Sequence, residues 1–537
     1  MATRRKVARL LLPLLLLLIV GGLMGADRLM RPVIHIKGLD DGAWLSAHEL
    51  DTLIVTVYAD QTGLGQVSVT VDDKPIRSVG AGGNSHIIHL PPTLSDAHHV
   101  LRVTVPGLLG PLRRSRGFTV RRSAPTLEVD QAKVTSLRAP LVVTGTTDPA
   151  ARISAPGATV TRKGDRFTLQ LGTPPPSGKI TIHAVDKAGN HTDTDVQITY
   201  VYPGTRAVWL ANQSFTSTTA MTNALSLAKA KKIDSVVLDV KPENGQLSYN
   251  SKVPFAQQVN ALPNKPVYDP AQTLTQLHNA GLRVIGRVYC YADQQIATDA
   301  THNHNHLDRL VTTPGGTVPY TDGAGQVSGN YVNLANPEIT GYLTALGVEA
   351  AQLGFDEVLY DDCRKPDATL DKMNYAGLKS PAIDQTIADF LDAARAKIRE
   401  QHAWVGATLD RQAASNASTV GQTIPSLTNA VDYLVPKLYP SQFKPGEFGV
   451  EDPKNKPYDA VRQATTSVVT YAGDDIPIVP ALQDFTPGGG TNPYGTTTYG
   501  STQLGQEFRA LHDQHVRRFL LWGPSTGKYD TTAIPAQ

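Results

Sequence analysis

From Arg206 onward, short apolar runs of strand type alternate with longer amphipathic segments of helix type. The strand-type runs number eight: Ala207–Ala211, Ser235–Val240, Arg283–Tyr289, Glu357–Asp361, Trp404–Asp410, Tyr433–Tyr439, Ile476–Leu482 and Arg518–Trp522. The helix-type segments between them are Thr219–Lys232, Pro270–Ala280, Pro337–Leu353, Pro381–Glu400, Pro457–Tyr471 and Thr502–His515. Several of these begin with proline, which is favoured at the first helical position. Eight strand–helix repeats predict a (β/α)8 TIM barrel over residues 204–537.

The region before the barrel has a different rhythm, in which short strands follow one another between Gly, Asp and Pro turns. Residues 32–122 hold strand-type runs at Leu53–Tyr58, Gln66–Val71, His86–Leu90 and Val100–Val105. Residues 123–203 hold further runs at Leu141–Thr144, Arg166–Leu171 and Lys179–Ala184. Regular short strands predict two all-β sandwiches.

The end of the second predicted sandwich carries a recognisable turn. The segment Ala184–Thr192 (AVDKAGNHT) resembles the closing hairpin of bacterial immunoglobulin-like domains. Its Gly and Asn tolerate the positive φ of such turns. The resemblance implies immunoglobulin-like sandwiches, which we interpret as spacers; glycan binding is the alternative. Because no helix-length segment follows the eighth barrel strand, we expect the second sandwich or the linker to cover the gap.

The N-terminus combines basic residues between Arg4 and Arg9 with an apolar stretch from Leu10 to Ala26. This pattern is typical of an export signal. Met24 stands where a cleavage site needs a small residue, so we expect residues 1–31 to form an uncleaved, single-pass membrane anchor. The rest of the chain would then be extracytoplasmic at the cell membrane, or secreted if the signal is cleaved.

Charge and cysteine content exclude several classes of protein. The whole chain carries +2, whereas residues 1–31 alone carry +5, so the remainder is slightly negative. Such a body lacks the concentrated positive face that nucleic-acid binding requires. Two cysteines among 537 residues exclude a disulfide scaffold. The predicted fold class is thus multidomain: a membrane anchor helix, two sandwiches and a barrel, with the oligomeric state left open.

Polar side chains gather where the predicted barrel strands end, which is where barrel active sites lie. A carboxylate at the end of a buried strand is costly unless it is paired or functional. The candidate substrate-binding residues are Asp239, Lys241, Arg287, Asp293, Arg364, Lys437, Tyr439, Gln483, Asp484 and Trp522. Trp522 could stack on a sugar face.

Two carboxylates are the minimal apparatus of glycoside hydrolysis. We predict that Asp361 and Asp410, on neighbouring strands, are the catalytic pair, with Asp361 as nucleophile or base because Arg364 could hold it ionised. Asp410 would then be the acid, although the two roles could be exchanged. The alternative for each is a carboxylate that caps a helix or pairs with an arginine. The adjacent Asp362 should point to the opposite face if the strand continues.

Cysteine, histidine and further aspartate side chains could carry other chemistry. Cys290 and Cys363 end neighbouring predicted strands, so an exported protein could join them in a disulfide. The run His302, His304, His306 lacks a helical metal-ligand spacing and reads as a solvated loop. A calcium site at Asp361, Asp362 and Asp367 is a minor alternative. The sequence predicts no metal and no cofactor.

The segment Tyr331–Pro366 (YVNLANPEITGYLTALGVEAAQLGFDEVLYDDCRKP) resembles a bacterial family of glycoside-hydrolase-like barrels with the hallmark WVNPY…EAAKLGFDEIQFDYVRFP. Further matches follow in the same order: Val237–Lys241 with VIDVK, Gly286–Asp293 with ARIVVFKD, Val435–Phe443 with SPMVYPSHY, Leu482–Phe485 with LQDF, and Leu520–Gly523 with MLWN. The resemblance implies a glycosidase acting on polysaccharide. It places Asp361 and Arg364 on the Asp and Arg of FDYVRFP and Asp410 on a fifth-strand Asp.

The chain departs from this family pattern next to Asp361. Asp362, Cys363 and Lys365 replace Tyr, Val and Phe, while Lys437 replaces Met and Gln442 replaces His. The site is therefore more polar than the family pattern. We predict a membrane-tethered glycoside hydrolase acting on an envelope or extracellular polysaccharide; the alternative is a carbohydrate-binding or scaffold protein with a silent barrel.

Overall fold

The computed structural model describes residues 33–59, 66–82, 84–106, 110–216, 218–302, 304–321, 330–379, 382–474, 476–487, 499–523 and 529–536. The chain divides into two compact units. One comprises the residues up to Ala132 together with Pro140–Thr199, and the other comprises Lys133–Ala139 and Tyr200–Gln537. The proposed domain boundaries at residues 31, 122 and 203 stay a prediction.

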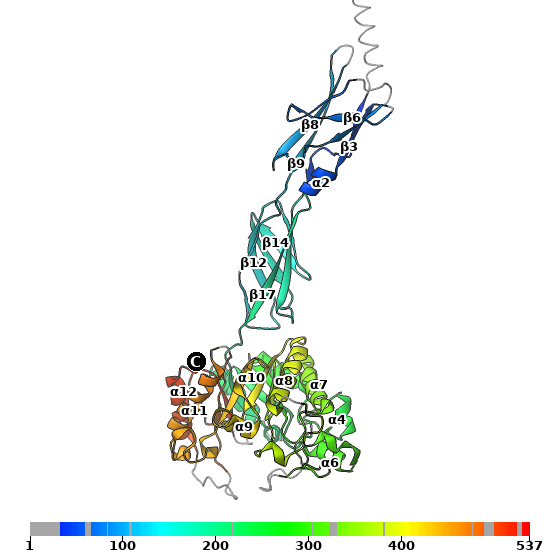
Figure 1. Cartoon of the computed structure of the whole chain (residues 1–537). Helices are drawn as coiled ribbons and strands as arrows, with labels where there is room; N and C mark the ends of the chain where they lie inside the picture. Colours follow the sequence, from blue (N-terminus) through cyan, green and yellow to red (C-terminus); the bar gives the residue numbers. More distant parts are fainter. Residues whose placement is uncertain are drawn as a thin grey trace, which may run out of the picture. The chain divides into compact units, whose positions relative to one another are not determined.

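The first unit is built of mainly antiparallel sheets in two pairs, and its β2–β9 pairing is parallel (Figure 1). In the first pair, the sheets β1-β3-β7-β6 and β2-β9-β8-β4-β5 share one apolar core, which includes Val57, Ile88, Leu101 and Phe118. The strands are β1 Ile34–Lys37, β2 Ala43–Leu45, β3 Ile54–Ala59, β4 Ser68–Val71, β5 Lys74–Pro75, β6 Ser78–Gly80, β7 Ser85–His89, β8 His98–Val105 and β9 Leu112–Val120. One short helix, α2 (Ala47–Thr52), begins at Ser46, whose hydroxyl accepts from the Glu49 N–H.

The second pair consists of β10-β12-β15-β14 and β11-β17-β16-β13. The strands are β10 Leu127–Val129, β11 Ala132–Val134, β12 Leu141–Thr147, β13 Arg152–Ser154, β14 Thr159–Lys163, β15 Arg166–Leu171, β16 Lys179–Val185 and β17 His191–Tyr200. β16 and β17 form a hairpin around Asp186, whose Oδ1 accepts from the N–H groups of Ala188 and Asn190, with Gly189 at φ +81°. An immunoglobulin-like classification of these sheets stays a prediction.

The second unit contains the expected closed, all-parallel barrel of eight strands. Its strands are β18 Arg206–Leu210, β19 Ser235–Lys241, β20 Arg283–Tyr289, β21 Glu357–Asp361, β22 Trp404–Leu409, β23 Tyr433–Leu438, β24 Ala481–Gln483 and β25 Phe519–Trp522. The side chains inside the barrel include Ala207, Val237, Ile285, Leu359 and Leu520. A packed interior of this kind leaves chemistry to the strand ends.

Helices pack around the barrel and contribute a second, larger apolar core (Figure 1). The longer ones are α3 Thr219–Lys229, α5 Pro270–Asn279, α7 Pro337–Leu353, α8 Ile383–Arg399, α11 Pro457–Ala472 and α12 Ser501–Asp513. The shorter ones are α4 Pro254–Gln258, α6 Gln294–His302, α9 Ala417–Val420 and α10 Ile424–Thr428. The α7 boundaries follow local rules: Asn336 accepts from the Glu338 N–H, Pro337 opens the helix, and Gly354 ends it at φ +112°.

The seventh strand is shorter and lies later than predicted. Its regular part is Ala481–Gln483, preceded by an isolated bridge between Ile478 and Leu434. Pro477 and Pro480 explain the difference, because proline has no N–H for a strand ladder. Their carbonyls still accept from the Leu434 and Leu520 N–H groups.

The prediction that a sandwich or the linker fills the place of the eighth helix was wrong. The C-terminal segment 529–536 does so instead. The Asp530 N–H donates to Asp484 Oδ2 at 2.8 Å, Lys232 Nζ donates to the Thr531 carbonyl at 2.6 Å, and Arg206 donates to the Pro535 carbonyl. Ile534 is almost fully buried. An extended segment can therefore close the barrel wall where a helix is missing.

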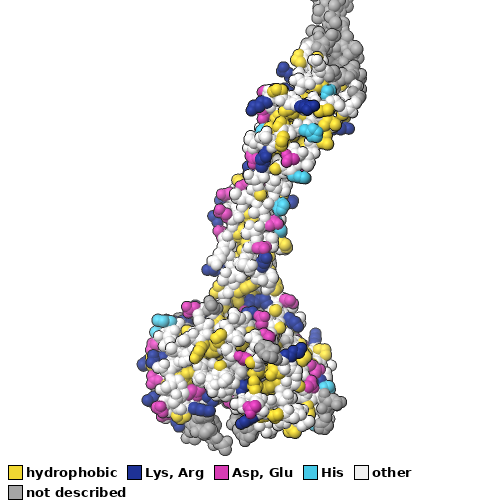
Figure 2. Space-filling view, in the orientation of Figure 1, with side chains coloured by type: hydrophobic (Ala, Val, Ile, Leu, Met, Phe, Trp, Pro, Cys, Tyr) yellow, Lys and Arg dark blue, Asp and Glu magenta, His cyan; other side chains and the backbone are white. Residues whose placement is uncertain are grey.

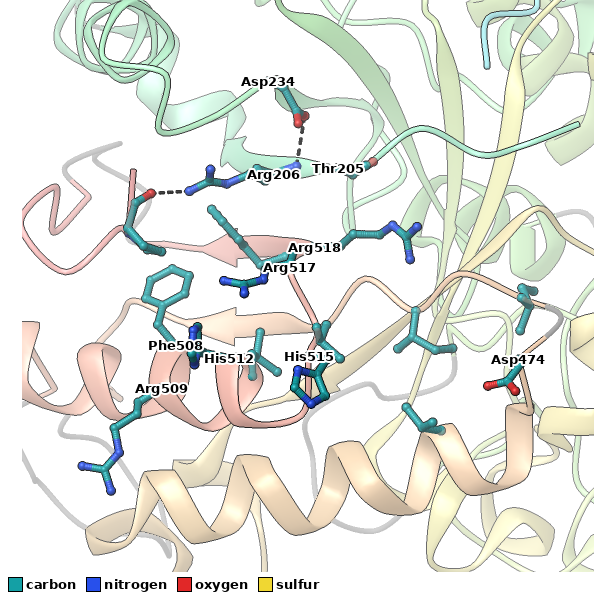
Figure 3. A pocket seen from close by; sticks show the side chains of 18 of the residues that line it. Thr205, Arg206, Asp234, Asp474, Phe508, Arg509, His512, His515, Arg517 and Arg518 are labelled. Atoms are coloured by element: carbon teal, nitrogen blue, oxygen red, sulfur yellow. Dashed lines mark hydrogen bonds between the residues drawn. The ribbon is translucent and has the colours of Figure 1, made fainter. Parts of the chain in front are cut away.

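The thin C-terminal segment leaves an apolar groove of about 920 Å³ at the amino-terminal ends of β18 and β25 (Figure 3). α11, α12 and Pro535 border this groove. Arg517 and Arg518 lie beside it, and neither has a hydrogen-bond or ion-pair partner among the residues described. The groove lies at the opposite end of the barrel from the strand ends that carry the candidate site.

The predicted fold class needs one correction, which concerns the membrane anchor. Residues 1–31, where the anchor was predicted, lie outside the described residues. Within the described part, no helix combines the length and the apolar character needed to cross a bilayer. The described structure therefore gives no support to the membrane anchor, and the extracytoplasmic location stays a prediction. In the view of Figure 2, acidic and basic side chains are interspersed over the barrel unit.

Candidate active site

Arg287, at the end of β20, is the centre of an ionic network at the carboxyl ends of three strands. Its Nε donates to Asp361 Oδ2 at 2.6 Å, its Nη1 donates to Asp239 Oδ1 at 2.8 Å, and its Nη2 donates to Glu243. The side chain is buried, and burial lowers its pKa, but the three carboxylates outweigh that effect and raise it. Arg287 is therefore a fixed cation that orients the carboxylates around it.

Aromatic rings cover the open side of this cation. The Trp522 ring centroid lies 4.8 Å from the Arg287 guanidinium, and the ring stacks on Trp209 at 4.0 Å with an interplanar angle of 10°. The Trp209 indole also donates to Asp239 Oδ1 at 3.1 Å. The predicted sugar-stacking residue Trp522 is thus held by both the network and a second tryptophan.

Asp361 ends β21 and is completely buried. Besides Arg287, it accepts from the Thr408 hydroxyl at 2.8 Å and pairs with Lys437 Nζ at 2.8 Å. Burial raises its pKa, but the charges of Lys437 and Arg287 prevail and hold the pKa well below its usual range. The charged form of Asp361 is therefore favoured by Lys437 and Arg287 and not, as predicted, by Arg364, which pairs with other carboxylates; both oxygens of Asp361 are occupied and neither faces solvent.

Asp362 does not point away from Asp361 as strand alternation predicts. It has φ +55°, so the strand ends one residue before it and the alternation no longer applies. Its Oδ2 lies 2.8 Å from the same Lys437 Nζ, and 14% of its side chain is exposed. Burial and the charge of Asp361 raise its pKa, against the opposing effect of Lys437. The charge of Asp361 thus favours the protonated form of Asp362.

Asp410 follows β22, and its two carboxylate oxygens contact different groups. Its Oδ1 accepts from the Gln412 N–H at 2.8 Å, which caps a short 3-10 helix at Arg411–Ala414, as the alternative interpretation expected. Its Oδ2 lies 3.7 Å from Arg364 Nε, and 17% of the side chain is exposed. Its backbone N–H donates to Gln422 at 2.8 Å, which fixes the position of the residue.

Arg364 joins Asp362 and Asp410. Its Nε lies 3.7 Å from an oxygen of each carboxylate, without a hydrogen bond to either. Its guanidinium lies 3.9 Å from the centroid of the Tyr291 ring and donates to Asp367. The partly exposed carboxylates that lie 3.7 Å from Arg364 Nε are thus Asp362 and Asp410, whereas Asp361 of the predicted pair is buried.

Like Asp239 and Arg287, the predicted substrate-binding residues Lys241, Asp293 and Gln483 are buried. Lys241 and Asp293 form a buried ion pair at 2.8 Å, and Lys241 also donates to the Tyr289 carbonyl at 2.8 Å. Gln483 is fully buried; it accepts from the Ser441 N–H at 3.2 Å and donates to the Phe485 carbonyl at 2.9 Å. These buried side chains bond to groups inside the protein and so position the strand ends.

Two of the remaining predicted residues border an open cavity at the ends of β24 and β25. Asp484 and Trp522 line this cavity, which has a volume of about 990 Å³. Burial raises the pKa of Asp484 to about 6. Tyr439 does not line this cavity; its ring lies edge-on to that of Phe485, with the two centroids 5.5 Å apart. Glu243, Thr408 and Tyr291 join the site without having been predicted; Glu243 follows Lys241 by two residues, and this proximity was the available signal.

The cysteines are not joined. Cys290 and Cys363 are both buried free thiols, and Cys290 donates weakly to the Val288 carbonyl at 3.3 Å. Burial raises the pKa of Cys363, and the neighbouring Cys290 thiol raises it further, which disfavours the thiolate that disulfide formation needs. The predicted disulfide is therefore corrected to a pair of thiols. His302 bonds to the Thr298 carbonyl at 2.8 Å, and the described residues contain no cluster suited to a metal ion.

Comparison with known proteins shows a family to which the barrel region belongs. The family described as "Putative glycosyl hydrolase domain" matches residues 207–529. No curated relative matches the chain. Similar solved structures include a hypothetical protein from Ruminiclostridium thermocellum, with 22% identity, coverage of 37% of this chain and 96% of that chain, and a TM-score of 0.31. The spore cortex-lytic enzyme SleL of Bacillus cereus has 10% identity, coverage of 64% and 77%, and a TM-score of 0.37. The α-galactosidase of Thermus thermophilus in complex with stachyose has 13% identity, coverage of 72% of this chain and 74% of that chain, and a TM-score of 0.38.

Proposed function

Because this chain belongs to the "Putative glycosyl hydrolase domain" family, we propose that its barrel hydrolyses the O-glycosidic bonds of a polysaccharide with Asp362 and Asp410. The family assignment supports a glycoside hydrolase-like function in general. The pairing of these two residues is carried by one observation: they are the carboxylates at the ends of β21 and β22 that remain partly exposed, on either side of Arg364 Nε.

The proposed roles follow from the charges. Asp361 keeps its negative charge because Lys437 and Arg287 surround it, and that charge favours the protonated form of its neighbour Asp362. Asp362 would donate its proton to the leaving glycosidic oxygen. Asp410, beside the Arg364 cation, would act as base or nucleophile on the anomeric carbon. Asp361 is then a positioning residue that holds Lys437 and Arg287 in place.

The test is a polysaccharide panel assayed by release of reducing ends, with the wild type, Asp362→Asn, Asp410→Asn and the exposed control Asp474→Asn. We expect both site variants to lose activity by roughly 100- to 10,000-fold while the control retains it. Unchanged activity in Asp362→Asn would refute the acid role. Circular dichroism and denaturant unfolding of each variant separate a loss of chemistry from a loss of fold.

A non-catalytic carbohydrate-binding protein is the second candidate function. The observation that favours it is the complete enclosure of Asp361, the residue that the sequence predicted as nucleophile. Under this alternative, the variants would bind glycans as the wild type does, and no member of the panel would be cleaved by any of the proteins.

A further inference from the structure

The cavity at the ends of β24 and β25 adjoins the proposed reaction centre through Trp522. This ring lines the cavity and also lies over the guanidinium of Arg287, which binds Asp361. Gln442, just beyond β23, lines the cavity from the side of Lys437. A sugar bound in this cavity would therefore lie on the same rim of the barrel as the carboxylates that are proposed to react.

The described lining of the cavity carries acidic but no basic side chains. Asp484 and Asp530 are its charged residues, and the uncharged lining includes Phe485, Tyr499 and Trp522. One oxygen of Asp484 accepts from the Asp530 N–H at 2.8 Å, and no partner is recorded for the other among the described residues. A buried carboxylate without a cation is costly, so a ligand that supplies a positive charge would be favoured.

A second polar group in the cavity wall also lacks a partner. Tyr529 lines the cavity and is 7% exposed, and its buried hydroxyl makes no hydrogen bond. An unsatisfied buried hydroxyl destabilises the folded protein. Aromatic walls with a few converging polar groups are typical of saccharide and small-ligand sites.

We propose that this cavity is a subsite for a sugar unit with a free, protonated amino group, such as a de-N-acetylated hexosamine. The amino group would donate to Asp484, and the sugar ring would lie against Trp522. The same charges disfavour uronic acids, because their carboxylates would meet Asp484 and Asp530. The inference rests on the proposed glycosidase function for its place next to the reaction centre, but amine recognition can be tested apart from hydrolysis.

The test measures binding by isothermal titration calorimetry with the full chain carrying Asp362→Asn, so that turnover does not interfere. The probes are a glucosamine oligosaccharide and the N-acetylglucosamine oligosaccharide of equal length, at a pH just above the pKa of Asp484. A charge-assisted hydrogen bond should make the amine form bind at least about tenfold more tightly. Adding Asp484→Asn should reduce this preference to about twofold or less, whereas Asp474→Asn should leave it intact.

The preference should also fall as the pH is lowered through about 6, where Asp484 takes up a proton. Equal binding of the two oligosaccharides, or a preference that survives Asp484→Asn, would overturn the subsite. If a neutral glycan is cleaved in an Asp362-dependent way without amine preference, the subsite fails and the glycosidase proposal stands. If the amine form is preferred but no glycan is cleaved, the subsite stands and the glycosidase proposal fails.

Discussion

Asp361 and Asp362 are consecutive in the chain, yet each places a carboxylate oxygen 2.8 Å from the same Lys437 Nζ. The left-handed backbone of Asp362 makes this arrangement possible, because an extended residue would turn its side chain to the other face of the sheet. Both carboxylates share Lys437, but Asp361 also accepts a hydrogen bond from Arg287 at 2.6 Å, whereas Arg364 Nε lies 3.7 Å from Asp362. A proton is therefore easier to hold on Asp362 than on the enclosed Asp361.

Asp361→Asn should destabilise the fold as well as abolish activity. The substitution leaves Arg287 and Lys437 buried without their shared partner, which costs roughly 3–5 kcal/mol. The depressed pKa of Asp361 gives a sign for pH: its stabilising contribution is complete above the unfolded pKa of about 4 and is lost as the pH falls toward the folded value. Denaturant unfolding across acidic pH should show this loss in the wild type and not in the variant.

Asp362→Asn and Asp410→Asn should differ in their response to the leaving group. An aryl glycoside with an acidic phenol leaves without protonation, so it should recover much of the activity that Asp362→Asn loses on a polysaccharide. Asp410→Asn should stay inactive on both substrates, because attack at the anomeric carbon is still required. Steady-state kcat/KM on paired substrates measures this. Recovery in Asp410→Asn instead would exchange the two roles.

Lys437→Met should move the pH profile of activity to higher pH. Lys437 lowers the pKa of both Asp361 and Asp362, so its removal raises both. An acid must be protonated to act, and the decline of kcat/KM at high pH should therefore begin later in the variant. The exposed Lys444→Met is the matched control. A profile that stays in place would show that Asp362 is not the group whose titration limits activity.

Much of the barrel could be predicted because each buried parallel strand is a compact apolar run. The seventh strand was placed too early because Pro477 and Pro480 sit in an apolar run but cannot donate to a ladder. The site was predicted to the correct strand ends, since Arg287, Asp361, Arg364, Asp410 and Lys437 do meet there. The contact of Asp362 with Lys437 could not be predicted, because a single positive φ reverses the direction that the Asp362 side chain takes.

The closing of the barrel wall by the C-terminal segment could not be predicted from sequence patterns either. The segment 529–536 has no strand or helix periodicity, and it is held by backbone carbonyls that accept from Lys232 and Arg206, residues far away in the chain. Burial was also misjudged at Lys241 and Asp293, because their ion pair hides both charges inside the protein. Sequence spacing locates such residues near a site but does not distinguish a residue that touches a ligand from one that supports it.

Gly245→Ala should destabilise the protein more than Gly281→Ala does, although both glycines have nearly the same backbone, at φ +77° and +76°. A Cβ on Gly245 would lie 2.1 Å from Asp293 Oδ1, whereas a Cβ on Gly281 would meet nothing within 4 Å. The shared backbone strain is worth about 1–2 kcal/mol. The contact at Gly245 should add roughly 1–3 kcal/mol, because the Lys241–Asp293 ion pair must shift. Chemical denaturation of the two variants measures the difference; equal losses would show that the pair is not held by this close backbone approach.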